Sequence, residues 1–424
     1  MYQYKIEKIY PEIVPVIEIE TIPLNAKGFA DILSINLEYN IKLKRCKNRI
    51  DGLESHQWET VKKAINPYEY IYAYHGGHGG DTRSVAAIKP LSRSFFKMIE
   101  MIREFFKELI PDTNKTNSIE KIITLHVAEG PGGFIEAARY IRASCNDDHA
   151  IGITLIDDTN RIVPSWKSSR IFLENHPEVI ISRGADGTGN IYHPENINHL
   201  ENEITTRIGR IGRIDSNPEY KSNLAYLITA DGGFDYSVEY NYQEQVSSKL
   251  IFCEILTALK YQSAGGGFIC KFFDIISYFS VELIYLLYIF YDEIIIYKPL
   301  TSRIANSEKY IICRGFKGSG LRSIILPELF KILVDWNEYI DKTINHIFRE
   351  IPNEFIEHMK QINKYIIDHQ ITNINNAINM FNVNRYNQFH KTENKKKIMG
   401  IQIANAIEWC QKYEIPHYKP YHTS

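Results

Sequence analysis

The chain has 424 residues, enough for one large α/β domain with flanking segments or for two to three domains. Hydrophobic residues make up 44% and charged residues 24%, which are ordinary globular values, so the composition excludes a largely disordered chain. The formal net charge is −2, so any surface that binds nucleic acid has to be a local basic patch. The six cysteines form no C-x-x-C pair, which argues against zinc and disulfides and favours a reducing compartment.

The first part of the chain carries no chemical motif. Residues 1–60 mix strand-like and loop-like pieces, and the first residues lack the apolar core of a signal peptide. The run His75-Gly-Gly-His-Gly-Gly80 contains two histidines three residues apart. No matching Cys/His pair occurs elsewhere, so we predict a mobile loop and no metal site.

A helix is predicted from Ser92 to about Leu109. Apolar residues recur there at helical spacing, and Ser92 is a candidate N-cap. Lys97 is out of register with this apolar stripe, so its side chain points either into a site or to solvent. Next come a short buried strand, Ile122 to Val127, and a helix that begins at Phe134.

A glycine-rich loop, Glu129-Gly-Pro-Gly-Gly-Phe134, connects that strand to that helix. Glycines there permit a tight turn and a close approach of the backbone to a ligand. The loop is neither G-x-G-x-x-G nor a P-loop, which argues against a dinucleotide enzyme and against a nucleotidase. The pattern alone leaves a ligand-binding loop and a plain strand–helix connection equally open.

The middle of the chain alternates strands with helices. The predicted elements are strand Ala150–Ile156, strand Tyr226–Ala230, helix Gln243–Tyr261, strand Gly267–Lys271, helix Val281–Phe290, strand Ile294–Tyr297 and strand Tyr310–Arg314. Such alternation predicts an α/β fold with a doubly wound, Rossmann-like sheet. Residues 157–220 are polar and poorly periodic, and we expect them to line a site. Charges interrupt the apolar run Ile275–Tyr297, so a membrane span is not predicted.

Three charged residues flank apolar runs of this sheet: Asp231, Lys271 and Glu308. We interpret the three runs as buried parallel strands, which places the charges at neighbouring strand ends, where open α/β sheets bind ligands. A lysine flanked by carboxylates has a tunable pKa, as a general base requires. The alternative is a structural ion pair at the sheet edge. The regular placement favours an enzyme.

Several motifs together resemble the FtsJ-like (RrmJ-type) ribose 2′-O-methyltransferases, and within them the branch that makes cap 1 on messenger RNA. They cover about residues 60–316 in the family's order: Asn66-Pro-Tyr-Glu69, Ser92-Arg-Ser-Phe-Phe-Lys97, Ala128-Glu-Gly-Pro-Gly-Gly-Phe134, Asp186-Gly-Thr-Gly-Asn-Ile191, Pro194-Glu-Asn-Ile197, Ala230-Asp231-Gly-Gly-Phe234, Gly266-Gly-Phe-Ile-Cys-Lys271, Lys298-Pro-Leu-Thr-Ser-Arg303 and Asn306-Ser-Glu308-Lys-Tyr310. The chain looks like the version carried by large cytoplasmic DNA viruses. That likeness implies a location in the host cytoplasm and leaves packaging in the virion open.

The resemblance implies an S-adenosylmethionine-dependent enzyme that methylates the first transcribed nucleotide of capped mRNA. It implies the catalytic tetrad Lys97, Asp231, Lys271 and Glu308. It implies cofactor contacts at Glu129, Gly130, Pro131, Gly132, Gly133, Phe134, Asp186 and Asp231. It also implies capped RNA as a partner, with other capping or transcription proteins as further candidates, and neither membrane nor metal. We expect an N-terminal extension (1–60), a methyltransferase domain (61–320) and a helical C-terminal region (321–424).

One departure from the family pattern concerns the end of the first strand, where His126 stands at a commonly acidic position. We expect the nearby Glu129 to supply the missing carboxylate beside the cofactor. A catalytically silent RNA-binding or scaffolding subunit remains the alternative function, and ribosomal or transfer RNA the alternative substrate.

Overall fold

The structure is a computed structural model that describes residues 2–50, 52–73, 84–111, 121–204, 206, 224–234, 240–383 and 392–418. The predicted loop at His75–Gly80 lies outside these residues.

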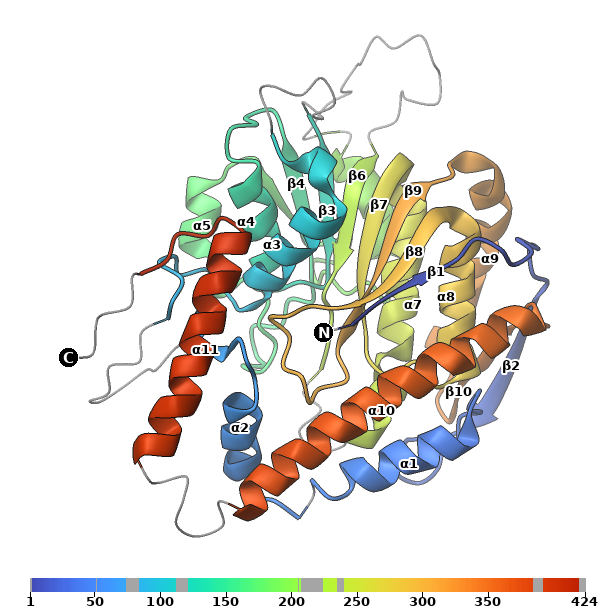
Figure 1. The fold of residues 1–424 in the computed structure, drawn as a ribbon. Helices are drawn as coiled ribbons and strands as arrows, with labels where there is room; N and C mark the ends of the chain where they lie inside the picture. Colours follow the sequence, from blue (N-terminus) through green and yellow to red (C-terminus); the bar gives the residue numbers. More distant parts are fainter. Residues whose placement is uncertain are drawn as a thin grey trace.

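An eight-stranded sheet forms the centre of the molecule, in the order β1-β8-β9-β7-β6-β3-β4-β5 (Figure 1). Its strands are β1 (Tyr2–Ile6), β3 (Ile123–Val127), β4 (His149–Ile153), β5 (Val179–Ser182), β6 (Ala225–Ala230), β7 (Gln262–Phe272), β8 (Tyr291–Lys298) and β9 (Lys309–Phe316). The five strands from β5 to β7 in the sheet order run parallel. β9, β8 and β1 alternate in direction beyond them. The predicted α/β sheet is confirmed.

The prediction that all three charge-flanking strands are parallel is wrong for β9. β9 pairs antiparallel with β7, and Lys271 lies opposite Tyr310. Since β9 runs the other way, its first residues lie at the edge where β6 and β7 end. Glu308 precedes β9 and therefore reaches the same edge as Asp231 and Lys271.

Helices cover both faces of the sheet (Figure 1). One face packs against a large apolar core that includes α7 (Gln243–Tyr261), α8 (Tyr278–Phe290) and α9 (Ser319–Asn337). A second core, with α3 (Ser94–Phe105), α4 (Gly133–Ile141) and α11 (Thr392–Lys412), covers the other face. The bounds of α7 agree with the prediction. α3 begins at Ser94 with Arg93 as its N-cap residue, so the prediction of Ser92 as the cap is wrong.

The region from 157 to 220 holds more regular structure than its polar sequence indicated. Its described part contains α5 (Arg170–Asn175), the edge strand β5 and α6 (Pro194–Glu203). β5 has only four residues, too few for a visible period in the sequence. Short helical turns also occur at η1 (Glu69–Tyr72), η2 (Lys107–Leu109) and η5 (Tyr240–Tyr242).

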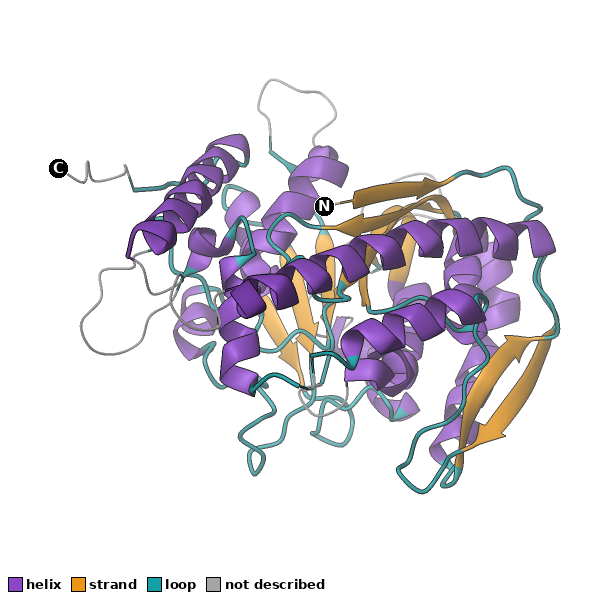
Figure 2. Ribbon diagram, turned by 60° about the horizontal axis from the view of Figure 1, so that its bottom comes forward, coloured by secondary structure: helices purple, strands orange, loops and turns teal. Residues whose placement is uncertain are grey.

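Several of the first elements of the chain pack against elements that follow residue 341. β1 is the edge strand of the central sheet, next to β8. β2 (Ile17–Pro23) pairs with β10 (Lys342–Phe348) in a second, two-stranded sheet, which Figure 2 shows apart from the central strands. α1 (Leu37–Lys47) packs along α10 (Asn353–Val383), and α2 (Ser55–Ala64) contacts it too. The three-part division at residues 60 and 320 stays a prediction, and contacts cross both of its boundaries.

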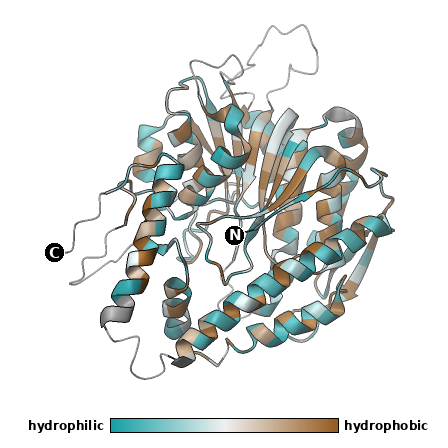
Figure 3. Cartoon of the chain, in the orientation of Figure 1, coloured by the Kyte–Doolittle hydropathy of each residue, from teal (hydrophilic) through white to brown (hydrophobic). Residues whose placement is uncertain are grey.

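The hydropathy of the elements agrees with these layers. Figure 3 shows apolar residues on the central strands and a mixture of polar and apolar residues on α10 and α11. α8 is buried along almost its whole length, which explains its apolar sequence without a membrane. Among the described residues, none of the helices combines the length and apolar character needed to cross a bilayer.

Candidate active site

The four predicted catalytic side chains converge at one edge of the sheet. Asp231 directly follows β6, Lys271 lies near the end of β7, and Glu308 directly precedes β9. Lys97 reaches the same edge from the first turn of α3. The sequence left Lys97 between site and solvent, and the structure places it in the site.

The four side chains form two ion pairs. The Lys97 Nζ lies 2.6 Å from a Glu308 carboxylate oxygen, and the Lys271 Nζ lies 3.1 Å from an Asp231 carboxylate oxygen. Lys271 also donates a hydrogen bond of 2.6 Å to the backbone carbonyl of Asp231. Each of the four side chains keeps 12–14% of its surface exposed. The pairs are therefore largely desolvated but can still be reached by a substrate.

Tyr310 connects the two pairs, and the sequence analysis did not assign it a role. Its hydroxyl donates a 2.8 Å hydrogen bond to Asp231, and it lies 3.3 Å from Glu308 and 3.4 Å from the Lys97 Nζ. Residues two apart on a strand share a face, so the position of Tyr310 relative to Glu308 was a usable signal. The site is one connected network of five side chains.

The neighbouring carboxylates set the protonation of Lys271. Burial by itself would lower the pKa of Lys271, but Asp231 and Glu308 outweigh burial and hold that pKa above its usual value. Burial likewise opposes ionisation of Glu308, yet Lys97 and Lys271 hold its pKa well below its usual range. At neutral pH the resting site thus contains an ammonium at Lys271 and a carboxylate at Glu308.

The glycine loop lies between β3 and α4, as predicted. Gly132 has a φ of +103°, which favours glycine. A Cβ on Gly130 would come within 2.3 Å of the Ser165 carbonyl oxygen, and one on Gly133 within 2.2 Å of the Ser94 hydroxyl. The glycines are therefore required by contacts with the protein's own chain. Pro131 and Phe134 complete the turn, and the Phe134 ring is fully buried against the sheet.

Glu129 is placed differently from the other loop residues. Its carboxylate is buried and lies 3.2 Å from the Nδ1 of His126, and it also accepts a hydrogen bond from the Thr229 hydroxyl. His126 is itself bonded to Thr124 and Thr229 at 2.9 and 2.7 Å. In this arrangement the Glu129 carboxylate is a polar partner for the buried ring of His126. The expectation that it takes the place of an acid beside a cofactor stays a prediction.

Asp186 shapes the turn after β5. Its carboxylate accepts hydrogen bonds from the backbone and hydroxyl of Thr188 and from the Asn196 amide, and it lies 2.6 Å from the His193 Nδ1. The backbone hydrogen bond of Thr188 is the main cause that lowers the pKa of Asp186. Asp186, His193 and Glu195 also lie close enough together to offer three ligand atoms to a metal ion. His193 and Asp186 pair with each other, so their close approach has a structural explanation without an ion.

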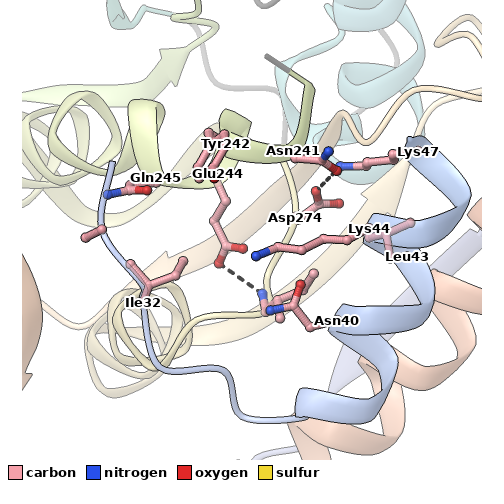
Figure 4. A pocket seen from close by; sticks show the side chains of 12 residues that line it. Ile32, Asn40, Leu43, Lys44, Lys47, Asn241, Tyr242, Glu244, Gln245 and Asp274 are labelled. Carbon is pink, nitrogen blue, oxygen red and sulfur yellow. Dashed lines mark hydrogen bonds and ion pairs between the residues drawn. The ribbon is translucent and has the colours of Figure 1, made fainter. Parts of the chain in front are cut away.

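The segment after Lys271 is held by a second set of buried charges (Figure 4). Lys47 from α1 lies 2.5 Å from Asp274, and Glu244 from α7 accepts hydrogen bonds from the backbone of Ile276 and Ser277. Lys309 donates to the carbonyls of Phe273 and Ser307, so it ties the end of β7 to the residue before Glu308. Lys47, Glu244, Asp274 and Ile276 also line a small cavity of about 30 Å³, room for about one water molecule.

Known proteins match the chain across this site. The model of the FtsJ-like methyltransferase family matches residues 90–316, more than half of the chain, and this range contains the whole tetrad and the glycine loop. The cap-specific mRNA (nucleoside-2′-O-)-methyltransferase 1 of Homo sapiens is 31% identical over 330 residues, which cover 76% of this chain and 36% of that protein. The corresponding enzyme 1A of Caenorhabditis briggsae is 34% identical over 245 residues, 57% of this chain and 26% of that protein.

The chain thus spans about a third of the length of the human relative. Among solved structures, a ribosomal RNA methyltransferase from Plasmodium falciparum aligns over 54% of this chain and 99% of its own, with 17% identity. Its TM-score is 0.34, which is too low to carry an argument. The family match alone is decisive: the chain belongs to the FtsJ-like methyltransferase family.

Proposed function

We propose that this protein transfers a methyl group from S-adenosylmethionine to the ribose 2′-hydroxyl of the first transcribed nucleotide of capped mRNA. The observation that carries the proposal is the network of two lysine–carboxylate pairs joined by Tyr310 at the ligand-binding edge of the sheet. The relatives named as cap-specific mRNA 2′-O-methyltransferases support the choice of substrate.

The residues at this edge fit the proposed cofactor. Its sulfonium and amino groups are cationic, and Asp231 and Asp186 keep carboxylate surface exposed at 13% and 30%. The backbone of the glycine loop, Gly130 to Gly133, lies at the same edge, where ligands of open α/β sheets bind. When bound, the cofactor supplies an electrophilic methyl group.

Lys271 is proposed to act on the 2′-oxygen. Because the neighbouring carboxylates keep it protonated, its ammonium group stabilises the negative charge that develops on the oxygen as the hydroxyl passes its proton to solvent water. Asp231 holds Lys271 from two sides, through its carboxylate and its backbone carbonyl. Lys97 and Glu308 add a charge-balanced pair behind it, so the site orients the hydroxyl for in-line attack.

The remaining expectations about partners and place stay predictions. Capped RNA is the proposed macromolecular partner, and other capping or transcription proteins are candidates. A location in the cytoplasm of a virus-infected host follows from the sequence resemblance alone.

The decisive experiment measures transfer of labelled methyl groups to three short RNAs: cap-0, uncapped, and cap-0 already 2′-O-methylated at its first nucleotide. We expect incorporation into cap-0 RNA only. Lys271→Ala should abolish turnover and leave S-adenosylmethionine binding, measured by calorimetry, within about threefold of the parent, since Lys271 contacts the acceptor oxygen. Lys342→Ala, on the two-stranded sheet, is the matched control and should retain full activity.

The other outcomes separate the alternatives. Equal rates on capped and uncapped RNA would point to a ribosomal or transfer RNA substrate. Binding of capped RNA without binding of S-adenosylmethionine would favour a scaffolding subunit. Near-parental turnover in Lys271→Ala would overturn the role given to this lysine.

A further inference from the structure

Beneath the tetrad lies a carboxyl group that the proposed mechanism does not use. Glu254, near the middle of α7, is 1% exposed and points at the turn that follows β6. One of its oxygens accepts a 3.1 Å hydrogen bond from the backbone N–H of Gly232. The other lies 3.5 Å from the thiol of Cys270, the residue before Lys271. Glu254 thus contacts the turn after β6, which carries Asp231, and the end of β7, which carries Lys271.

The close fit of this contact explains the sequence of the turn. A Cβ on Gly232 would come within 2.2 Å of the Glu254 oxygen, so only glycine leaves room for the carboxyl group. A Cβ on Gly233 would come within 3.1 Å of the Lys271 Nζ. The two glycines therefore lie between Glu254 on one side and Lys271 on the other. Asp231 directly precedes them, so the same turn holds it in place.

We propose that Glu254 is a positioning residue of the active site, which fixes the Asp231–Gly232 turn and sets the charge beneath Lys271. The expected effects on kcat rest on the proposed function, whereas the expected structural effects rest on the geometry alone. Because a buried backbone N–H without a partner is unfavourable, the hydrogen bond from Gly232 to Glu254 constrains the turn.

The electrostatic surroundings of Glu254 support a role in setting charge. The ionisable groups that face it are Lys271 and Cys270 from β7, Asp231 after β6, and Cys253 on its own helix. Burial raises the pKa of Glu254 to about 8, although Lys271 opposes that rise. The group is therefore neutral at pH 7. Above about pH 8 it becomes an anion that further raises the pKa of Lys271.

The sign of the effect on stability follows from linkage. An acid whose pKa is raised on folding holds a proton that the unfolded chain has already lost. Its contribution to stability is complete below the unfolded value of 4.5 and disappears as pH rises towards about 8. Replacing Glu254 by glutamine removes this proton and keeps an oxygen for the Gly232 N–H.

The test compares Glu254→Gln and Glu254→Leu with the parent and with Glu282→Gln. Glu282 is a matched control because it is a buried acid on α8 that accepts a 2.8 Å hydrogen bond from the backbone N–H of Ile347 and pairs with His346, and its described partners include no member of the tetrad. Three quantities are measured for each 424-residue protein from pH 5 to 9: the unfolding temperature, and kcat and KM for methyl transfer.

Between pH 5 and 8, we expect the Tm of Glu254→Gln to fall less than the Tm of the parent. Its kcat at pH 7 should stay within about threefold, and the alkaline part of its kcat profile should move to lower pH. Glu254→Leu should lower kcat about tenfold or more with little change in KM, since it leaves the Gly232 N–H without a partner. Glu282→Gln should leave the kcat profile unchanged.

Two results would overturn the proposal. An unchanged pH dependence of Tm in Glu254→Gln shows that the group does not hold the proton, and this readout stands even if the protein methylates no RNA. A changed pH dependence of Tm together with parental kcat in both Glu254 variants would show that Glu254 stabilises the fold and does not position the active site.

Discussion

Tyr310 is the residue on which the geometry of the tetrad depends. Its hydroxyl is the single described group that contacts Asp231, Glu308 and Lys97. The buried phenol stays protonated, because burial and the carboxylates of Asp231 and Glu308 raise its pKa well above the usual value. Tyr310 can therefore donate to a carboxylate throughout the working pH range and hold the two pairs in register.

Tyr310→Phe should lower kcat/KM by roughly tenfold or more, because a hydrogen bond to a charged group is worth ~1.5–3 kcal/mol. Steady-state kinetics at pH 7.5 measures the loss. Tyr261→Phe is the control, since it removes a buried hydroxyl that donates 2.8 Å to the Ile197 carbonyl, on another side of the molecule. Equal losses in the two variants would show that Tyr310 acts through general stability.

At the scale of elements, α1 is connected to the active-site edge by one buried ion pair. Lys47 and Asp274 are 5% and 7% exposed, and Asp274 lies three residues after Lys271 (Figure 4). Burial by itself would raise the pKa of Asp274, but Lys47 and Lys309 hold it below its usual value. Burying one member of such a pair without the other leaves an uncompensated charge.

Lys47→Ala should therefore destabilise the protein by about 3 kcal/mol, at the lower end of the usual range because Lys309 remains near Asp274. Chemical denaturation followed by tryptophan fluorescence measures the change. Lys42→Ala, on the same helix, breaks an exposed pair with Glu38 and should leave the denaturation midpoint nearly unchanged. A loss of similar size in both variants would contradict the importance of the buried pair.

At the scale of the whole molecule, the C-terminal helix supports the helix that carries Lys97. The Trp409 ring of α11 is 2% exposed, and its Nε1 donates a 3.1 Å hydrogen bond to Glu100 on α3. Glu100 also accepts hydrogen bonds from Tyr297 and from the backbone of Leu300. α11, α3 and the end of β8 thus share one buried carboxyl group, one helical turn from Lys97.

Trp409→Ala should cost ~3–5 kcal/mol through the lost burial and the cavity, and it should also lower kcat because α3 loses its support. Thermal unfolding and methyl transfer measured on the same preparation test both effects. Ile401→Ala removes an exposed side chain, at 54%, from the same helix and should change neither quantity. Parental turnover in a destabilised Trp409→Ala protein would show that α11 supports the fold and not the site.

The sequence by itself determined the parts of this protein that depend on local pattern. The apolar run before Asp231, the run before Lys271 and the amphipathic stretch of α3 specified their elements because burial imposes a period on neighbouring residues. The glycine loop and the charged strand ends indicated the edge of the sheet where the site lies. Asp231, Lys271 and Glu308 could be singled out because each directly flanks such a run, whereas Lys97 was assigned to the tetrad only through the resemblance to the family.

Only the tertiary structure decided the features that join distant segments. The antiparallel direction of β9 depends on the connection through Lys298–Glu308, and no local pattern encodes it. The inward rotation of Glu129 onto His126 depends on Thr229 from another strand. The pairing of β2 with β10 and the contact of Trp409 with Glu100 join residues more than 300 positions apart. The local sequence pattern of each segment is compatible with several arrangements, and contacts between distant segments decide which one forms. For this reason these features could be recognised only in the fold.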